Sequence, residues 1–253
     1  MTFYRPVWSD LYDFALNRLE FGSHCVLCRG HGTHSRDLCD ACEGLLQRCL
    51  HTDRVGQRTQ LCLSCGDEFA AVDPAGGECL DCLGRGSPFQ QIVAPYRYAF
   101  PLDKMIHQLK YGDNRVYARV LGSLLRAAIA ADHELPDCLV PVPLAPGREK
   151  TRGYNQAADI ARWCASELVV PYWPYAAKRV VDTGSLAGLS RAARQLRIVG
   201  AFRADQAVCG KRIAIVDDVL TTGATARELA TELYDSGAVS VELWVLARTS
   251  RTR

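Results

Sequence analysis

The fold of this 253-residue chain is decided by residues 213–225, which read IAIVDDVLTTGAT. Apolar residues at the start predict a buried β-strand, and two adjacent carboxylates, Asp217 and Asp218, follow it. The chain then turns through two threonines and a glycine into residues 224–238, whose apolar spacing predicts a helix that closes at Gly237. A buried strand, a short loop and a helix form the unit of an α/β fold with a mostly parallel sheet.

The turn after this strand is suited to an anion. Backbone N–H groups at a helix start point outward with the positive end of the helix dipole, and a glycine there lets the backbone approach a ligand. The predicted phosphate cradle consists of Thr221, Thr222, Gly223, Ala224 and Thr225. The two carboxylates need a different partner, and the hydroxyl donors of a sugar diol would provide one. The stretch therefore predicts a site for a ribose phosphate.

The same alternation of strands and helices extends outward from this stretch. Strands are predicted at residues 92–100, 138–144, 211–218 and 239–248, and helices at residues 102–109, 115–130 and 155–169. Strands that alternate with helices predict a mostly parallel sheet with helices on both faces. Ligands of such sheets bind beyond the carboxyl ends of the strands, where the acid pair, Asp217 and Asp218, is expected.

Composition divides the chain into segments. Residues 1–24 carry an apolar stripe at helical spacing and predict an amphipathic helix rather than a signal peptide. Residues 25–83 are rich in cysteine, glycine and polar residues, so they bury little core without metal. Residues 84–90 are typical of a linker, and residues 91–253 are expected to form the α/β domain.

Eight of the twelve cysteines fall in four CxxC pairs before residue 83. These are Cys25 with Cys28, Cys39 with Cys42, Cys62 with Cys65, and Cys79 with Cys82. This spacing predicts two closed structural zinc sites in a double zinc ribbon, rather than disulfides or an iron–sulfur cluster, and favours the reducing cytoplasm. Pairing within each block is the simplest assignment, but Cys25 and Cys28 could also share a metal with Cys62 and Cys65.

Charge and composition give no argument for nucleic-acid binding. The formal net charge is +2, and two zinc ions held by eight thiolates would bring it to about −2. Residues 25–82 contain Phe69 as their only aromatic residue, so protein contact or domain packing is favoured there. No apolar run approaches the roughly 18 residues of a membrane span. An ATPase would also need a GxxxxGK[ST] loop, and the sequence contains none.

Residues 213–225 resemble the phosphoribosyl-pyrophosphate loop of type I phosphoribosyltransferases, whose pattern they match throughout. The motif RGYNQ at residues 152–156 and the later stretch from Gly188 to Phe202 narrow the resemblance to the ComF family of phosphoribosyltransferase-like proteins. In that family a cysteine-rich start, a motif like HQLKY at residues 107–111, the RGYNQ motif and the phosphoribosyl loop occur in this order. Leu186 and Arg197 depart from the family pattern, in a segment that the resemblance places in a closing loop.

The resemblance assigns roles to individual residues. Asp217 and Asp218 would hold the ribose hydroxyls and favour the positive charge that develops on the anomeric carbon. Magnesium would bridge the pyrophosphate and the ribose hydroxyls. The expected pyrophosphate site contains Val142, Pro143, Arg148 and Arg152, with Arg191 reaching phosphates on closure. Taken alone, basic residues in a loop such as the one after Pro143 are more often a solvated surface.

Two functions follow from the resemblance. The first is a phosphoribosyltransferase that displaces pyrophosphate from phosphoribosyl pyrophosphate with a nitrogenous acceptor, linked to DNA uptake or utilisation. The second is a non-catalytic module that binds phosphoribosyl pyrophosphate or a nucleotide and acts through protein partners. An amidophosphoribosyltransferase with its own glutaminase is excluded, because no cysteine follows Met1 and the chain is too short for that domain.

Overall fold

The computed structural model describes residues 24–32, 37–49, 59–70, 77–80, 82–84, 86–112, 114–181 and 198–249. The chain divides into two compact units, Met1–Glu43 and Gly44–Arg253. Most of the predicted N-terminal helix and the segment with Leu186, Arg191 and Arg197 lie outside the described residues.

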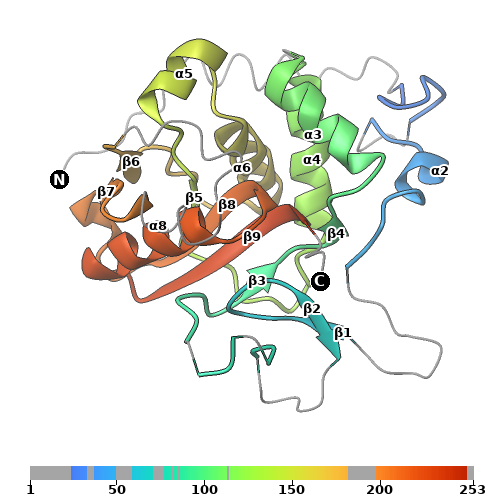
Figure 1. Ribbon diagram of the computed structural model, residues 1–253. Helices are drawn as coiled ribbons and strands as arrows, with labels where there is room; N and C mark the ends of the chain where they lie inside the picture. Colours follow the sequence, from blue (N-terminus) through green and yellow to red (C-terminus); the bar gives the residue numbers. More distant parts are fainter. Residues whose placement is uncertain are drawn as a thin grey trace. The chain divides into compact units, whose positions relative to one another are not determined.

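A five-stranded sheet forms the centre of the larger unit (Figure 1). Its strands are β3 (Ile92–Val93), β4 (Tyr96–Arg97), β5 (Cys138–Pro141), β8 (Arg212–Leu220) and β9 (Ser240–Arg248). The order is β3-β9-β8-β5, β4 also pairs with β9, and all of these pairings are parallel. The predicted parallel α/β fold is therefore confirmed.

Helices cover both faces of this sheet (Figure 1). They are α3 (Leu102–Tyr111), α4 (Val116–Ala127), α6 (Gln156–Leu168) and α8 (Ala224–Asp235). Ile213 and Ile215 of β8 share a buried cluster with Leu229 and Leu233 of α8. Successive strand residues point to opposite faces, so the buried residues between them, such as Ala214, belong to the other face. There α6 packs on β5 and β8, and α4 packs on α6.

The predicted strand at residues 92–100 is two short strands instead of one. Pro95 separates β3 from β4, and a proline has no N–H to donate to a neighbouring strand. Both pieces still pair with β9 in parallel, Ile92 with Leu243 and Tyr96 with Ala247. The prediction of extended chain was right, and the interruption follows from the proline.

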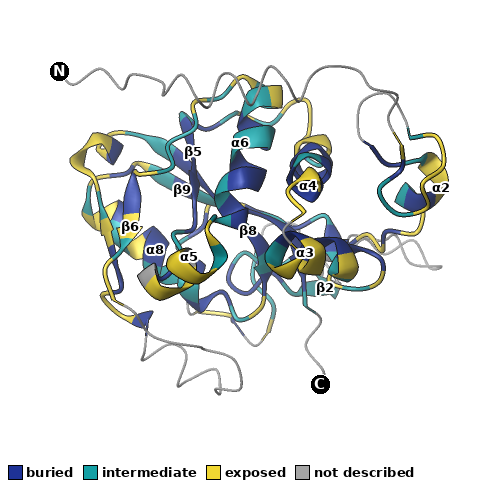
Figure 2. Cartoon of the chain, turned by 90° about the horizontal axis from the view of Figure 1, so that it is seen from above, coloured by how far each residue is buried: buried dark blue, intermediate teal, exposed yellow. Residues whose placement is uncertain are grey.

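Several short elements were not predicted. They are α2 (Asp40–Glu43), α5 (Pro146–Arg152), the 3-10 helix η1 (Gln206–Val208), and two antiparallel pairs, β1 (Thr59–Leu61) with β2 (Glu68–Ala70) and β6 (Ala177–Arg179) with β7 (Phe202–Ala204). Figure 2 shows a buried centre at β5 and β8, and exposed outer surfaces on α3 and α5. Among the described residues, no helix has the length and apolarity that crossing a membrane requires.

Candidate phosphate-binding site and metal centres

The acid pair lies at the carboxyl end of β8, beside the end of β5. The N–H of Val142 donates to the carbonyl of Val216 at 2.9 Å, which places Val142 next to Asp217. Asp218 is only 4% exposed, and its N–H donates to Oδ1 of Asp217 at 2.9 Å. Two carboxylates are thus held together at the edge of the sheet where ligands of parallel α/β folds bind.

A lysine that the sequence reasoning left without a role completes this cluster. Lys110, near the end of α3, places Nζ 2.7 Å from Oδ2 of Asp218. The apolar stripe of α3 includes Ile106, which is buried. Because residues four apart share a helix face, Lys110 follows Ile106 on the side that packs inward. This spacing was the signal that could have identified Lys110 from the sequence.

The cluster shifts the pKa of its members. Burial first, and the charge of Asp218 second, raise the pKa of Asp217 to about 7, while Lys110 acts in the opposite direction. Burial alone would lower the pKa of Lys110, but the carboxylates of Asp218 and Asp217 outweigh it and raise that pKa. Lys110 therefore remains a cation, and Asp217 is the carboxyl that gains or loses a proton near neutral pH.

The threonine loop, Thr221–Gly223, connects the acid pair to α8. Gly223 is the N-cap of α8 with a φ of 74°, a left-handed conformation that glycine adopts without strain. The hydroxyl of Thr222 accepts from the N–H of Ala224 at 3.4 Å, and the side chain of Thr221 is exposed. Backbone amides and hydroxyls thus gather at the positive end of the α8 dipole, a few residues from the acid pair.

The motif RGYNQ, at residues 152–156, connects α6 to its neighbours by hydrogen bonds. Asn155 is the N-cap of α6 and accepts from the N–H of Ala157 at 3.0 Å. Its Nδ2 donates to the carbonyl of Val142 at 3.0 Å, and the hydroxyl of Tyr154 donates to the carbonyl of Leu109. These residues therefore fix the end of β5 and the end of α3 against α6.

The basic residues expected in a pyrophosphate loop lie on helix α5 instead. Pro146–Arg152 is helical, with Arg148 exposed and Arg152 partly buried. The guanidinium of Arg152 lies 5.2 Å from the ring centre of Tyr111, which follows Lys110. The structure thus places Val142 beside the acid pair and Arg152 beside Tyr111. For Arg148 it shows an exposed side chain.

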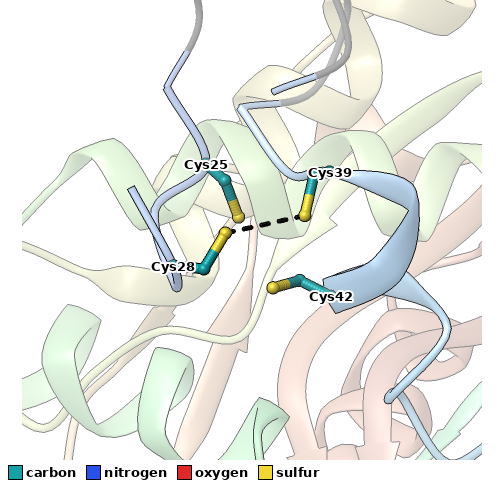
Figure 3. A group of neighbouring side chains, drawn as sticks. All are labelled: Cys25, Cys28, Cys39 and Cys42. Carbon is teal, nitrogen blue, oxygen red and sulfur yellow. Dashed lines mark hydrogen bonds between the residues drawn. The ribbon is translucent and has the colours of Figure 1, made fainter. Parts of the chain in front are cut away.

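Two groups of four cysteines have the geometry of tetrahedral metal sites. Cys25, Cys28, Cys39 and Cys42 form one group, and Cys62, Cys65, Cys79 and Cys82 form the other, with Sγ atoms within 4.8 Å of one another in each. Figure 3 shows the first four side chains converging. A zinc–sulfur bond of about 2.3 Å places tetrahedral sulfurs about 3.8 Å apart. The Sγ atoms of Cys28 and Cys39 are 3.7 Å apart, and those of Cys65 and Cys79 are 3.8 Å apart.

The structure therefore pairs the cysteines within each block, which was the simplest of the predicted assignments. The pKa values differ among the thiols of each group, since burial raises the pKa of Cys42 to about 12 and also raises the pKa of Cys65 and Cys79. Burial raises the pKa of Cys25, but backbone N–H groups of Cys28, Cys39 and Leu27 outweigh it and lower that pKa to about 6. Backbone hydrogen bonds likewise lower the pKa of Cys62 against the effect of burial. Both groups fit a divalent metal that prefers thiolates.

The remaining cysteines do not belong to these groups. Cys49, Cys138 and Cys164 are buried, and burial raises the pKa of each to about 12, so they are inert core thiols. Cys209 is exposed. The interpretation of these four as ordinary core or surface cysteines agrees with their burial.

Fold and site together define an α/β protein with an acid pair and a threonine loop between β8 and α8, and with two four-cysteine groups positioned to bind metal ions. The chain is 35% identical over 200 residues to the DNA utilization protein YhgH of Salmonella typhimurium, covering 77% of this chain and 87% of the relative. It is 33% identical over 235 residues to YhgH of Escherichia coli K12 (89% and 96%), and 29% identical over 237 residues to competence protein F of Haemophilus influenzae (90% and 98%). The chain belongs to the ComF family, as predicted.

Solved structures give weaker matches. One is the glutamine phosphoribosylpyrophosphate amidotransferase from B. subtilis complexed with ADP and GMP, with a TM-score of 0.35 and 21% identity. Another is the allosteric regulatory enzyme of purine biosynthesis, with a TM-score of 0.37 and 22% identity. The matches cover 51% and 55% of this chain, and 25% and 29% of those chains. No protein-family model matches the chain.

Proposed function

We propose that this protein binds 5-phosphoribosyl-1-pyrophosphate with magnesium and transfers the phosphoribosyl group to a nitrogenous acceptor. The observation that carries the proposal is the acid pair at the end of β8, followed three residues later by the threonine loop and six residues later by the start of α8. This arrangement offers carboxylates that accept hydrogen bonds from ribose hydroxyls and, a few residues on, N–H and hydroxyl groups that donate to a phosphate.

Each part of the site has a role in the proposed reaction. The amides at the start of α8 and the hydroxyls of Thr221, Thr222 and Thr225 bind the 5-phosphate. The acid pair accepts hydrogen bonds from the ribose hydroxyls and favours the positive charge that develops on the anomeric carbon. The backbone at Val142 and Pro143 and the cation of Arg152 face the pyrophosphate.

The bonds that change are confined to the anomeric carbon. The carbon–oxygen bond to pyrophosphate breaks, and pyrophosphate leaves with the electron pair. The acceptor nitrogen forms a new bond to the same carbon and then loses its proton to solvent. The acid pair stays a hydrogen-bond acceptor throughout, so no side chain needs to form a covalent intermediate.

The residues present are compatible with magnesium. Magnesium prefers oxygen ligands, and the carboxylates of the acid pair supply them, with Oδ2 of Asp218 ion-paired to Lys110 at 2.7 Å. With a pyrophosphate ligand bound, the phosphate oxygens and ribose hydroxyls would hold the ion, beside Asp217 and Asp218. The ion would neutralise charge on the leaving group.

The metal centres are proposed to hold structural zinc. Four thiolates leave no open coordination position, which distinguishes a structural from a catalytic site. The family relatives are named for DNA utilization and for competence. We therefore propose an acceptor derived from nucleic acid, such as a nucleobase.

Calorimetric titration of phosphoribosyl pyrophosphate with magnesium tests the proposal. We expect micromolar affinity for the unmodified protein, and at least about a hundredfold weaker binding when Asp217→Asn and Asp218→Asn are combined. Asp235→Asn is the matched control, because Asp235 is an exposed carboxylate at the other end of α8. Equal affinity of the double variant and the control would mean that the acid pair is not the site.

Release of pyrophosphate separates transfer from binding alone. A transferase releases pyrophosphate when the correct acceptor is added to the bound complex, and a binding module retains it. Screening nucleobases and their derivatives against the complex therefore identifies the acceptor. Tight binding with no pyrophosphate release from any nucleobase acceptor would favour the non-catalytic module.

A further inference from the structure

The second cysteine group lies against the threonine loop. Its first turn, Cys62–Asp67, is called here the second knuckle, and the corresponding turn of the first group, Cys25–Gly30, the first knuckle. The second knuckle belongs to the same compact unit as β8 and α8. Three of its residues contact the segment that precedes or begins α8, each by a different kind of interaction.

The first contact passes through a buried arginine. Arg248, at the end of β9, is 3% exposed, and its Nη1 donates to the carbonyl of Thr221 at 2.8 Å and of Leu220 at 3.3 Å. Its Nη2 donates to Oδ1 of Asp67 and forms an ion pair with it. Charge-assisted hydrogen bonds of this kind are stronger than neutral ones. One guanidinium thus joins the second knuckle to the backbone of the threonine loop.

The second contact is one of packing. Gly66 has a φ of 69°, and a Cβ on it would overlap Cδ2 of Leu220. The side chain of Leu220, which is 4% exposed, therefore occupies the space that a side chain at position 66 would need. Leu220 is the residue immediately before the threonine loop, so its side chain is held by the turn that carries Cys65.

The third contact reaches the first turn of α8. Nη2 of Arg227 donates to the hydroxyl of Ser64 at 2.6 Å, and Ser64 is 3% exposed between the two cysteines of the knuckle. The N–H of Arg227 donates to the carbonyl of Gly223 at 2.9 Å, which closes the first turn of the helix. Ser64 thus fixes the side chain of Arg227, whose backbone N–H closes the first turn of α8.

We propose that the metal at Cys62, Cys65, Cys79 and Cys82 controls the phosphate affinity of the threonine loop, with Arg248, Gly66 and Ser64 as the positioning residues. The shape of the second knuckle depends on ligation, because few apolar residues surround it. Loss of the metal removes the fixed positions of Asp67, Gly66 and Ser64 together. The loop then loses its support, and the amides that bind phosphate lose their alignment. This inference rests on the proposed function only for the identity of the ligand.

Coupling between two sites is reciprocal, so the ligand must also protect the metal. The test uses the unmodified, metal-loaded protein exposed to a zinc-selective chelator, with and without saturating phosphoribosyl pyrophosphate and magnesium. Freed thiols are alkylated and located by mass spectrometry. We expect the ligand to slow the loss of metal from the second cysteine group about tenfold. Metal loss from the first cysteine group, in the other compact unit, should not change and serves as the internal control. Equal slowing of both groups, or of neither, when calorimetry shows bound ligand would overturn the proposal.

A second measurement needs no ligand. Hydrogen exchange of residues 220–227 is compared in the unmodified protein and in Ser64→Ala and Asp67→Asn variants, each verified to hold two metal ions per chain. We expect at least fivefold faster exchange of these amides in both variants and unchanged exchange in α6. Unchanged exchange at residues 220–227 in both variants would contradict the coupling. If phosphoribosyl pyrophosphate fails to bind at all, the proposed function fails, and this second measurement still decides the coupling.

Discussion

The first and second knuckles close with the same backbone hydrogen bonds but carry different residues at the same positions. Arg29 donates to the carbonyl of Cys25 at 2.8 Å, as Gly66 does to that of Cys62 at 2.6 Å. Both residues adopt a positive φ, 64° for Arg29 and 69° for Gly66. An exposed arginine is tolerated in this conformation in the first knuckle. The glycine of the second knuckle is therefore needed for packing against Leu220 rather than for the turn itself.

The neighbouring positions of the two knuckles also carry different residues. The first knuckle has Leu27 and Gly30 where the second has Ser64 and Asp67. Ser64 and Asp67 are the two that bond to Arg227 and Arg248. The same turn thus occurs in both four-cysteine groups, and in the second group it is joined to the threonine loop and to α8. Two predictions test that difference, and a third tests the acid pair.

The largest effect is expected from removing metal ligands. Cys62→Ser with Cys65→Ser should weaken phosphoribosyl pyrophosphate binding about 10- to 100-fold, because the threonine loop loses its support. The matched change, Cys25→Ser with Cys28→Ser, should alter affinity less than about threefold. Calorimetry measures both, with zinc content determined in parallel. A similar loss of affinity in both variants would remove the distinction between the knuckles.

A smaller effect is expected from one methyl group. Gly66→Ala adds a Cβ that overlaps Leu220 and introduces a side chain at a positive φ. It should lower the free energy of unfolding of the larger unit by about 1–3 kcal/mol. Gly86→Ala adds a Cβ at the same φ of 69° but with no atom within 4 Å of it, so it should cost at least about 1 kcal/mol less.

Denaturant unfolding of the two variants measures this contrast. An equal cost at both positions would mean that backbone conformation, and not contact with Leu220, requires the glycine. The zinc content of each variant serves as the control, since loss of metal would itself lower stability.

The smallest effect is the pH dependence of binding, and it concerns the acid pair rather than the knuckles. The pKa of Asp217 is raised to about 7, first by burial and then by Asp218. Ribose hydroxyls need an ionised acceptor, so affinity for ribose 5-phosphate should rise roughly tenfold between pH 6 and pH 8. Because the folded protein holds this proton more tightly than the unfolded chain, stability should fall as pH rises towards 7.

Asp217→Asn is the control for this pH dependence. The titration of the phosphate itself is common to both proteins, so any difference between them belongs to Asp217. We expect the variant to bind weakly with a flatter profile across pH 6–8. An identical profile in both proteins would show that Asp217 does not titrate in the site.

Much of this site could be predicted from the sequence. The strand, acid pair and threonine loop were read from residues 213–225 because they are contiguous, and local spacing determines that unit. The cysteine pairs were equally local, and the structure selected among their predicted pairings. Contacts between distant segments were not predictable in this way. Lys110 lies 108 residues before Asp218, and Asp67 lies 181 residues before Arg248.

The missed elements have a common physical reason. The helix α5 follows two prolines and carries charged residues without an apolar stripe, so no periodicity marks it. The pair of β1 with β2 consists of three-residue strands, too short for alternation to be recognised. Such segments take their structure from neighbours and metal rather than from their own pattern.

The central claim is that the threonine loop binds the phosphate of phosphoribosyl pyrophosphate. Hydrogen exchange of the metal-loaded protein, with and without the magnesium complex of this ligand, tests it most directly. We expect slower exchange at residues 220–226 and near Val142, with little change in α4. Calorimetric binding accompanied by protection elsewhere, and none at residues 220–226, would contradict it.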